Sequence, residues 1–224
     1  MEDYLKAAYL IRERGEEITT FALAQALALR PPSVTGMVKR LAELGMLEHR
    51  SYQPMSLTPL GEALALEVVR HHRLLELYLA RFLDMPWEEV HAEADRLEHH
   101  ISEALEERIA ARLGQPAFDP HGDPIPTRDL VVPRREVCRL VDLAPGVPAL
   151  VARIEQQEPA VLQYLESVGL VPGATIALLS ANAYAGVVTV RIGAPDAAAQ
   201  EQTIGSELAG RILVSPDGAV EGAS

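Results

Sequence analysis

Residues 90–109, VHAEADRLEHHISEALEERI, combine histidines and carboxylates at spacings that could hold a metal ion. On a helix that turns by about 100° per residue, four of these side chains fall on one face roughly 100° wide. Imidazole and carboxylate groups suit first-row divalent ions, and a cation relieves the repulsion between crowded carboxylates. A solvated acidic helix explains this segment alone equally well. The four side chains on the shared face are His91, Asp95, Glu98 and His99.

A long amphipathic helix is predicted over residues 59–83, and it adds a second pair of possible ligands. His72 and Glu76 are four residues apart and therefore share one face of this helix. Its apolar side is too extensive for a solvated helix, so we expect it to pack against a partner chain. His71 and His100 point about 100° away from the proposed ligands and are expected at the surface or in support of the ligands.

The composition limits the other classes of site. Cys138 is the single cysteine among 224 residues, which excludes an intrachain disulfide framework and a cysteine-based zinc cluster. The N-terminal residues lack the apolar run of a secretory signal, and no segment reaches the roughly 18 apolar residues of a membrane span. We therefore expect a cytoplasmic protein with no membrane partner, whose metal site uses histidine and carboxylate groups.

The first 60 residues have the element order of a winged helix-turn-helix. Apolar periodicity predicts helices over 3–14 and 20–27, and a third helix begins at the prolines of RPPSVTGMVKRLAELGML. Two short strands, MLEHR and PMSLT, follow around a polar turn. Although the net charge of the chain is −12, residues 1–60 hold seven basic and seven acidic side chains. The acidic character lies elsewhere, so DNA binding by this part is compatible with the composition.

The C-terminal third of the chain is predicted to be a separate β-rich domain. Residues 114–149 hold seven prolines, which indicates ordered turns and a linker rather than regular structure. Strand-like runs follow at ATIALLS and VVTVRIG, joined by a loop at 182–186. Residues 217–224 are expected to form a loose tail.

Taken in order, MEDYLKAAYL, the helix-turn-helix, RHHRLLE, VHAEADRLEHH and FDPHGDPIP resemble the diphtheria-toxin-repressor and manganese-transport-regulator family of bacterial metal-dependent repressors. The resemblance covers nearly the whole chain. It implies an α+β, mainly α fold with a winged helix-turn-helix over 1–60 and a helical metal-binding and dimerisation domain over 61–125. A proline-rich linker over 126–147 and a small SH3-like β-barrel domain, similar to FeoA, over 148–216 would follow.

The resemblance also implies two metal sites. Asp3 by itself would be an acid that stabilises a helix start, but its position matches a ligand of the primary regulatory site. The acids at 3 and 95 stand where iron-responsive members carry methionine and cysteine, so hard oxygen ligands favour Mn(II), with Fe(II) next. The implied primary site is Asp3, Asp95, Glu98 and His99, and the implied ancillary site is His72, Glu76 and His91.

Other positions qualify this assignment. Lys6 stands where compact binuclear manganese regulators carry a glutamate, and because a cation cannot ligate we expect two separated sites. The C-terminal domain of related proteins lends ligands to the ancillary site, and Glu155 to Glu158 contain suitable residues or are solvated polar residues at a helix start. His121 is expected to have a structural hydrogen-bonding role, and Cys138 to be an incidental thiol.

The recognition helix is expected to begin at the prolines, with phosphate contacts from its basic residues and readout that relies on methyl contacts and DNA shape. The family's base-reading glutamine is replaced by Gly36, which changes the expected operator preference. Alternatively, the Thr35 hydroxyl satisfies a backbone carbonyl, and the wing is a plain surface turn. The predicted DNA-binding residues are Pro32, Ser33, Thr35, Gly36, Lys39, Arg40, Arg50 and Tyr52, with Gln53 beside them in the wing.

The sequence therefore predicts a transcriptional regulator, not an enzyme, that uses Mn(II) or Fe(II) as corepressor and binds a palindromic operator in double-stranded DNA as a homodimer. No small organic substrate is expected. Two alternatives stay open: a winged-helix regulator that senses an organic ligand, and a di-metal carboxylate enzyme. The first is disfavoured by few aromatic residues, at 4%, and the second because it leaves the winged helix unexplained.

Overall fold

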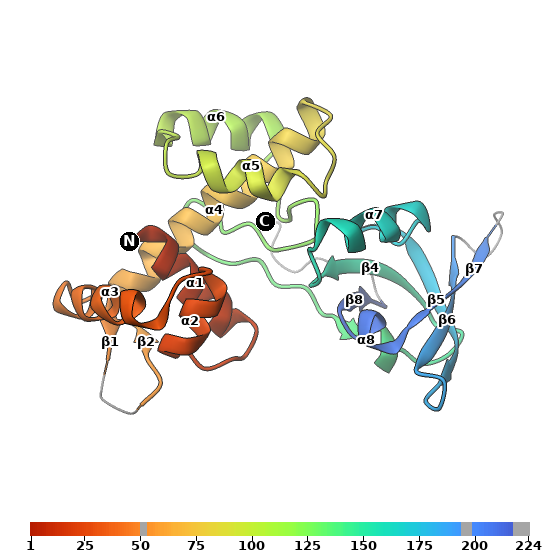
Figure 1. The fold of residues 1–224 in the computed structure, drawn as a ribbon. Helices are drawn as coiled ribbons and strands as arrows, with labels where there is room; N and C mark the ends of the chain where they lie inside the picture. Colours follow the sequence, from red (N-terminus) through yellow and green to blue (C-terminus); the bar gives the residue numbers. More distant parts are fainter. Residues whose placement is uncertain (50–52, 194–198, 217–224) are drawn as a thin grey trace.

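A computed structural model describes residues 1–49, 53–193 and 199–216. Three parts follow one another along the chain: a small helical part with a two-stranded wing, a helical part built on one long helix, and a β-rich part (Figure 1). The predicted fold class is confirmed by this arrangement. Within the described residues, no helix has the length and apolar character needed to cross a membrane.

The N-terminal part is the predicted winged helix-turn-helix. It contains α1 (Glu2–Glu13), α2 (Thr20–Ala26), α3 (Pro31–Glu43), β1 (Leu47–Glu48) and β2 (Ser56–Leu57). The Thr19 hydroxyl caps α2 by accepting from the Ala22 amide, and α3 begins with proline in its first turn, where the missing N–H costs nothing. Leu5, Leu23 and Leu41 are fully buried in the shared core.

Helix α4 (Pro59–Phe82) connects the first two parts. Its N-terminal half belongs to the core of the winged helix through Ala65, Leu66 and Val69, and its C-terminal half contributes Leu74 and Leu75 to a second core. The expectation that its apolar face is buried against a partner chain is therefore wrong for these residues. They are covered within the chain because one helix serves two cores.

Residues 90–109 do not form the single helix that their periodicity suggested. Helix α5 (Val90–Leu97) ends one residue before Glu98, and α6 (Glu103–Leu113) begins after a turn. The Ser102 hydroxyl accepts from the Leu105 amide and so starts the second helix with its own cap. His99 consequently lies in the turn and not on the face of α5.

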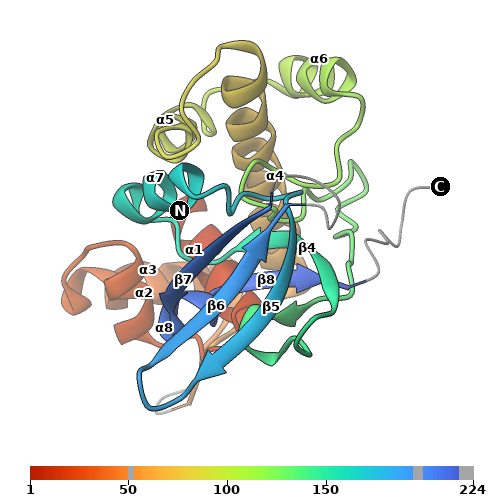
Figure 2. The ribbon, with the colours of Figure 1, turned by 90° about the vertical axis from the view of Figure 1, so that its right-hand side faces the viewer.

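The C-terminal part is a six-stranded antiparallel sheet with strand order β3-β8-β4-β5-β6-β7. Figure 2 shows β5, β6 and β7 side by side, and in β5 and β6 buried apolar residues alternate with more exposed ones. The elements are β3 (Cys138–Arg139), the 3-10 turn η1 (Leu140–Asp142), β4 (Pro148–Ile154), α7 (Pro159–Ser167), β5 (Thr175–Asn182), β6 (Val187–Ile192), β7 (Gln200–Gly205), α8 (Ser206–Ala209) and β8 (Ile212–Ser215).

The segment FDPHGDPIP joins the helical part to the sheet. Ile125 is buried in the core of α4 and α6, and the Ile154 amide of β4 donates to the His121 carbonyl. Gly122 has φ +87°, and a Cβ there would lie 2.0 Å from the Ala152 carbonyl oxygen. Only glycine allows this close approach of the two backbones.

Replacing Gly122 by alanine should loosen this junction. The left-handed conformation alone costs a side-chain residue about 1–2 kcal/mol, and the collision with β4 adds to it. We expect a lower melting temperature and faster trypsin cleavage at Arg128, Arg134 and Arg135. Gly146→Ala is the matched control, because Gly146 has φ +80° and no atom within 4 Å of an added Cβ. Equal effects of the two substitutions would contradict this account.

Candidate metal centre

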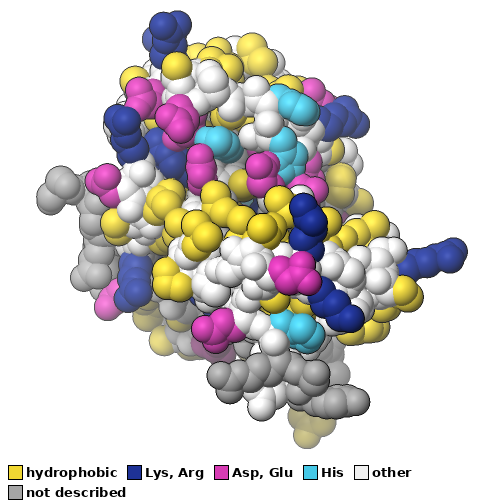
Figure 3. Space-filling view, turned by 90° about the vertical axis from the view of Figure 1, so that its left-hand side faces the viewer, with side chains coloured by type: hydrophobic (Ala, Val, Ile, Leu, Met, Phe, Trp, Pro, Cys, Tyr) yellow, Lys and Arg dark blue, Asp and Glu magenta, His cyan; other side chains and the backbone are white. Residues whose placement is uncertain are grey.

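Histidine and carboxylate side chains from α1, α4, α5 and the turn after α5 meet between the winged helix and the helical part. In Figure 3, histidine and acidic side chains gather on the upper half of the visible face, over the helical part. The possible ligand atoms form three groups, and the atoms of each group lie within 4.8 Å of one another. Every residue of the two predicted sites belongs to one of these groups.

The first group is Asp3, Glu98 and His99. His99 Nε2 lies 2.6 Å from Asp3 Oδ1 and 3.4 Å from Glu98 Oε1, and its Nδ1 lies 2.6 Å from Glu2 Oε2. Because Asp3 is in α1 and Glu98 follows α5, this group joins the DNA-binding part to the helical part. Burial lowers the pKa of His99, but the carboxylates of Glu2 and Asp3 outweigh that effect and raise it.

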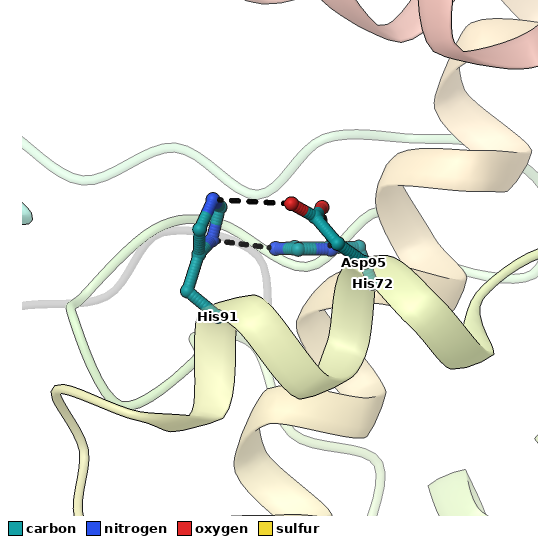
Figure 4. Close-up of side chains that lie close together, drawn as sticks. All are labelled: His72, His91 and Asp95. Carbon is teal, nitrogen blue, oxygen red and sulfur yellow. Dashed lines mark hydrogen bonds and ion pairs between the residues drawn. The ribbon is translucent and has the colours of Figure 1, made fainter.

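The second group is His72, His91 and Asp95 (Figure 4). His72 comes from α4, while the other two residues are one turn apart on α5, and all three side chains point toward one another. His72 Nε2 lies 3.0 Å from His91 Nδ1, and His91 Nε2 lies 3.7 Å from Asp95 Oδ2. Glu76 Oε1 is 2.9 Å from both His72 Nε2 and His91 Nδ1, so this carboxylate adjoins the group.

The structure groups the predicted ligands differently from the predicted primary and ancillary sites. Asp95, predicted for the primary site, lies with His72 and His91, and none of the three groups places it with Asp3. The reason is the turn after α5, which directs His99 toward α1 while Asp95 stays on the helix. The predicted ligand sets themselves stay a prediction.

Glu76, predicted for the ancillary site, forms a third group with Asp119 and His121, which were not identified as ligands from the sequence. All three are buried, and His121 Nδ1 lies 3.9 Å from Glu76 Oε2. His121 Nε2 lies 2.9 Å from the Trp87 carbonyl, which agrees with the expected structural role. Yet His121 Nδ1 and Asp119 Oδ2 are buried without a hydrogen-bond partner. The motif FDPHGDPIP was the available signal, but only the fold places it beside α4.

The unpartnered atoms of Asp119 and His121 suit a cation. A buried polar atom without a partner is costly, and a divalent ion held by these two atoms and Glu76 would give both atoms a partner. All three groups offer only imidazole nitrogen and carboxylate oxygen, the donors that first-row divalent ions accept. The residues present therefore fit a metal ion, with oxygen ligands in the majority of the first and third groups.

The charged forms of His72 and Glu76 favour one another. Burial lowers the pKa of His72, but the charge of Glu76 and the hydrogen bonds with Glu76 and Glu98 outweigh it and raise the pKa to about 9. Burial would raise the pKa of Glu76, but the charge of His72 holds it well below its usual range. For His121, burial is outweighed by Glu76 and Asp119, and its pKa is also raised to about 9.

Lys6 lies between the first two groups. Its Nζ is 2.6 Å from Glu98 Oε2, 2.9 Å from Asp95 Oδ1 and 2.9 Å from His72 Nδ1. Lys6 thus contacts members of both groups, and the expectation of two separated sites stays a prediction. His71, predicted to support the ligands or lie at the surface, is buried, with Nδ1 3.2 Å from the Glu98 carbonyl and Nε2 3.0 Å from Glu106. His100 is exposed.

The C-terminal domain reaches the same region. A hollow of about 110 Å³ is lined by Glu76 and His91 together with Glu155 and Gln157 from beyond β4. Gln157 Nε2 donates to Asp123 Oδ2 over 2.7 Å, and Arg153 forms an ion pair with Asp123. Two of the four residues from Glu155 to Glu158 therefore line the hollow beside the predicted ancillary site.

The predicted DNA-contacting residues of α3 lie on its exposed face. Val34 and Val38 are buried on the opposite side, so the amphipathic period fixes which side chains face outward. Thr35 Oγ1 donates to the Pro31 carbonyl over 3.0 Å, as in the alternative considered for it. Arg50 and Tyr52 lie outside the described residues. The exposed residues are Pro32, Ser33, Thr35, Gly36, Lys39 and Arg40.

The pKa of His72 gives a prediction for the metal-free protein. A raised folded-state pKa stabilises the fold fully below the usual value of 6.5, and this contribution is lost as the pH rises through about 9. We expect the melting temperature in chelator to fall over this window, and His72→Gln to flatten the fall. Thermal melts at several pH values check this, and an equal slope for the variant would contradict it.

Comparison with known proteins places these features in a family. Family models described as the DNA-binding domain of iron-dependent repressors, as their metal-binding and dimerisation domain, and as the FeoA domain match residues 1–54, 58–127 and 138–216. The iron-dependent repressor IdeR of Mycobacterium leprae is 33% identical over 187 residues, which cover 78% of this chain and 81% of that protein.

Other similar proteins include the diphtheria toxin repressor of Corynebacterium diphtheriae, 31% identical over 165 residues, which cover 70% of this chain and 72% of the relative. Among solved structures, a manganese-dependent transcriptional repressor in complex with manganese is 36% identical with a TM-score of 0.88. That match covers 96% of this chain and 98% of the solved chain. The expected resemblance is confirmed, and the chain belongs to the iron-dependent repressor family of metal-dependent transcriptional regulators.

Proposed function

We propose that this protein is a repressor that uses Mn(II), or Fe(II), as corepressor and controls genes of metal-ion homeostasis. The observation that carries this proposal is the first group of ligand atoms. Asp3 belongs to α1, which packs in the core of the winged helix, whereas Glu98 and His99 belong to the helical part. A ligand held by all three would act on the position of the recognition helix.

The mechanism follows from charge. Without a divalent ion, Glu98 is compensated by Lys6 and His72, while Asp3 is joined to the helical part through His99. These contacts hold the winged helix less firmly than one ion bound by Asp3, Glu98 and His99 together would. A divalent ion bound there would supply two positive charges. Asp3 and His99 would then fix α1, and the spacing of the two recognition helices in a dimer would match successive major grooves.

Manganese is favoured by the ligand types. Asp3 and Asp95 are hard oxygen donors, and the three groups of ligand atoms found among the described residues consist of histidine and carboxylate side chains without cysteine. The M. leprae relative is named for iron and the solved structure for manganese, so the family includes both uses. Asp3, Glu98 and His99 would form one site, and His72, Glu76 and His91 with Asp95 another.

A homodimer on a palindromic operator is the proposed DNA-bound form. The matching family model is described as a dimerisation domain, and two-fold symmetry of the protein would correspond to two-fold symmetry of the site. Figure 3 shows a band of hydrophobic side chains across the middle of its face. Leu44, Leu60 and Leu105 are among the exposed apolar residues of the winged helix and the helical part.

Of the two alternatives, the di-metal carboxylate enzyme is not supported by the relatives, which are named as transcriptional regulators. A winged-helix regulator that senses an organic ligand would bind DNA independently of divalent ions. The same DNA-binding experiment therefore separates it from the proposal.

DNA binding should depend on the metal. We expect the protein to bind a fragment of its own promoter region about 10- to 100-fold more tightly with Mn(II) or Fe(II) than with chelator, a coupling typical of allosteric ligands. The double substitution Glu98→Ala with His99→Ala should abolish the difference in a gel-shift titration. His100→Ala is the control, because His100 is exposed beside the site and belongs to none of the three groups. DNA affinity that ignores metal and chelator would refute the proposal.

Gly36 should determine operator preference without a role in folding. An added Cβ at Gly36 meets no atom within 4 Å, and glycine inside a helix costs up to about 1 kcal/mol relative to other residues. Gly36→Gln should therefore keep or raise the melting temperature. It should also change the base preference, with a discrimination of about 1–3 kcal/mol in binding free energy at the contacted base pair. Selection of bound sequences from a random pool measures this. An unchanged consensus would count against the placement of α3 in the groove.

A further inference from the structure

The side chain of Lys6 occupies the junction between two groups of possible metal ligands. Lys6 is only 8% exposed, although lysine is rarely buried unless paired. Its ammonium contacts Glu98, which belongs to the group with Asp3, and Asp95, which belongs to the group with His72. One cation therefore bridges both groups.

We propose that Lys6 is a tethered cation that holds the metal-free cleft together and that divalent ions must displace, so that it sets the metal concentration to which the protein responds. This inference rests on the proposed function, since it concerns the same cleft. Unlike a ligand, Lys6 would act by competition, and it would lower the affinity of both groups.

Lys6 compensates the charge of a buried carboxylate. Glu98 is 2% exposed, and its Oε2 has two close nitrogen neighbours, Lys6 Nζ and His72 Nδ1, each at 2.6 Å. A buried carboxylate that loses its partner is strongly destabilising. An arriving ion that takes this oxygen must break both contacts. An ion that binds Oε1, which lies 3.4 Å from His99 Nε2, would meet the Lys6 charge on the other oxygen of the same carboxylate.

Lys6 also has space beside it. It lines both the hollow of about 110 Å³ beside Glu76 and a larger hollow of about 590 Å³ that Asp3, Asp95 and Glu98 also line. Because a lysine has a flexible four-carbon side chain, its ammonium would give up its present contacts by rotation of that side chain within the larger hollow. An arginine would reach the same carboxylates but would hold them with a planar group of several donors.

The test compares Lys6→Met with the full-length wild-type protein. By titration calorimetry, Mn(II) should bind Lys6→Met at least about tenfold more tightly, because the competing charge is gone. In chelator, however, Lys6→Met should melt at a lower temperature than the wild type, and saturating Mn(II) should remove that deficit. Opposite changes in metal-free stability and metal affinity are the signature of a displaced cation.

Two further variants sharpen the comparison. Arg96→Met removes a positive charge from α5, where Arg96 is exposed and pairs with Glu93, and it should leave Mn(II) affinity unchanged. Lys6→Gln keeps a hydrogen-bond donor without the charge and should resemble Lys6→Met, so it serves if the methionine variant fails to fold in chelator.

The outcomes separate this inference from the proposed function. If the wild type binds Mn(II) and both Lys6 variants bind it with unchanged affinity, the tethered-cation role is wrong and the metal-dependent function stands. If neither the wild type nor the variants bind Mn(II), Fe(II) or another divalent ion, the proposed function itself fails. Tighter binding by Arg96→Met to the same extent would also overturn the inference, because the effect would then be one of overall charge.

Discussion

The structure depends on the neutralisation of carboxylates that are buried where three parts of the chain meet. Glu76 and Glu98 are each 2% exposed, and taking such groups from water is favourable only when cations are in contact with them. The basic side chains beside them are Lys6, His72 and His121. These contacts join α1, α4 and the segment after α6.

The same principle extends to the C-terminal domain. Arg73 of α4 donates to Glu13 of α1 over 3.1 Å and to the Pro124 carbonyl over 2.6 Å, while Arg153 of β4 pairs with Asp123 and lies 3.5 Å from Glu13. Glu13 thus faces an arginine from each of the other two parts. The end of α1 is therefore linked by charge to α4 and to β4.

Sequence reasoning could identify most elements, because caps, prolines and apolar periods act locally. The recognition helix, α4 and the strands β5 and β6 follow from such signals, and every proposed ligand belongs to one of the three groups. The break after α5 was missed because the period of residues 90–109 continues across it, and only the cap at Ser102 marks it. Asp95 accordingly lies with His72 and not with Asp3.

Two features could not be predicted because they depend on tertiary packing. Asp119 and His121 approach Glu76 only after the proline-rich segment folds back onto α4, and nothing in their own spacing points to that helix. The sequence indicated that Lys6 cannot ligate, but not that its ammonium contacts both Asp95 and Glu98. The predicted domain bounds also stay a prediction, since packing across the junctions joins the parts closely.

The central claim is that metal bound at the junction of α1 and α5 fixes the DNA-binding part against the helical part. Hydrogen exchange followed by mass spectrometry, with Mn(II) and with chelator, tests it most directly. The account predicts slower exchange with Mn(II) in peptides from α1 and from residues 95–102, and unchanged exchange in β5 and β6. Equal exchange of α1 in both conditions, in a protein shown to have bound the ion, would contradict it.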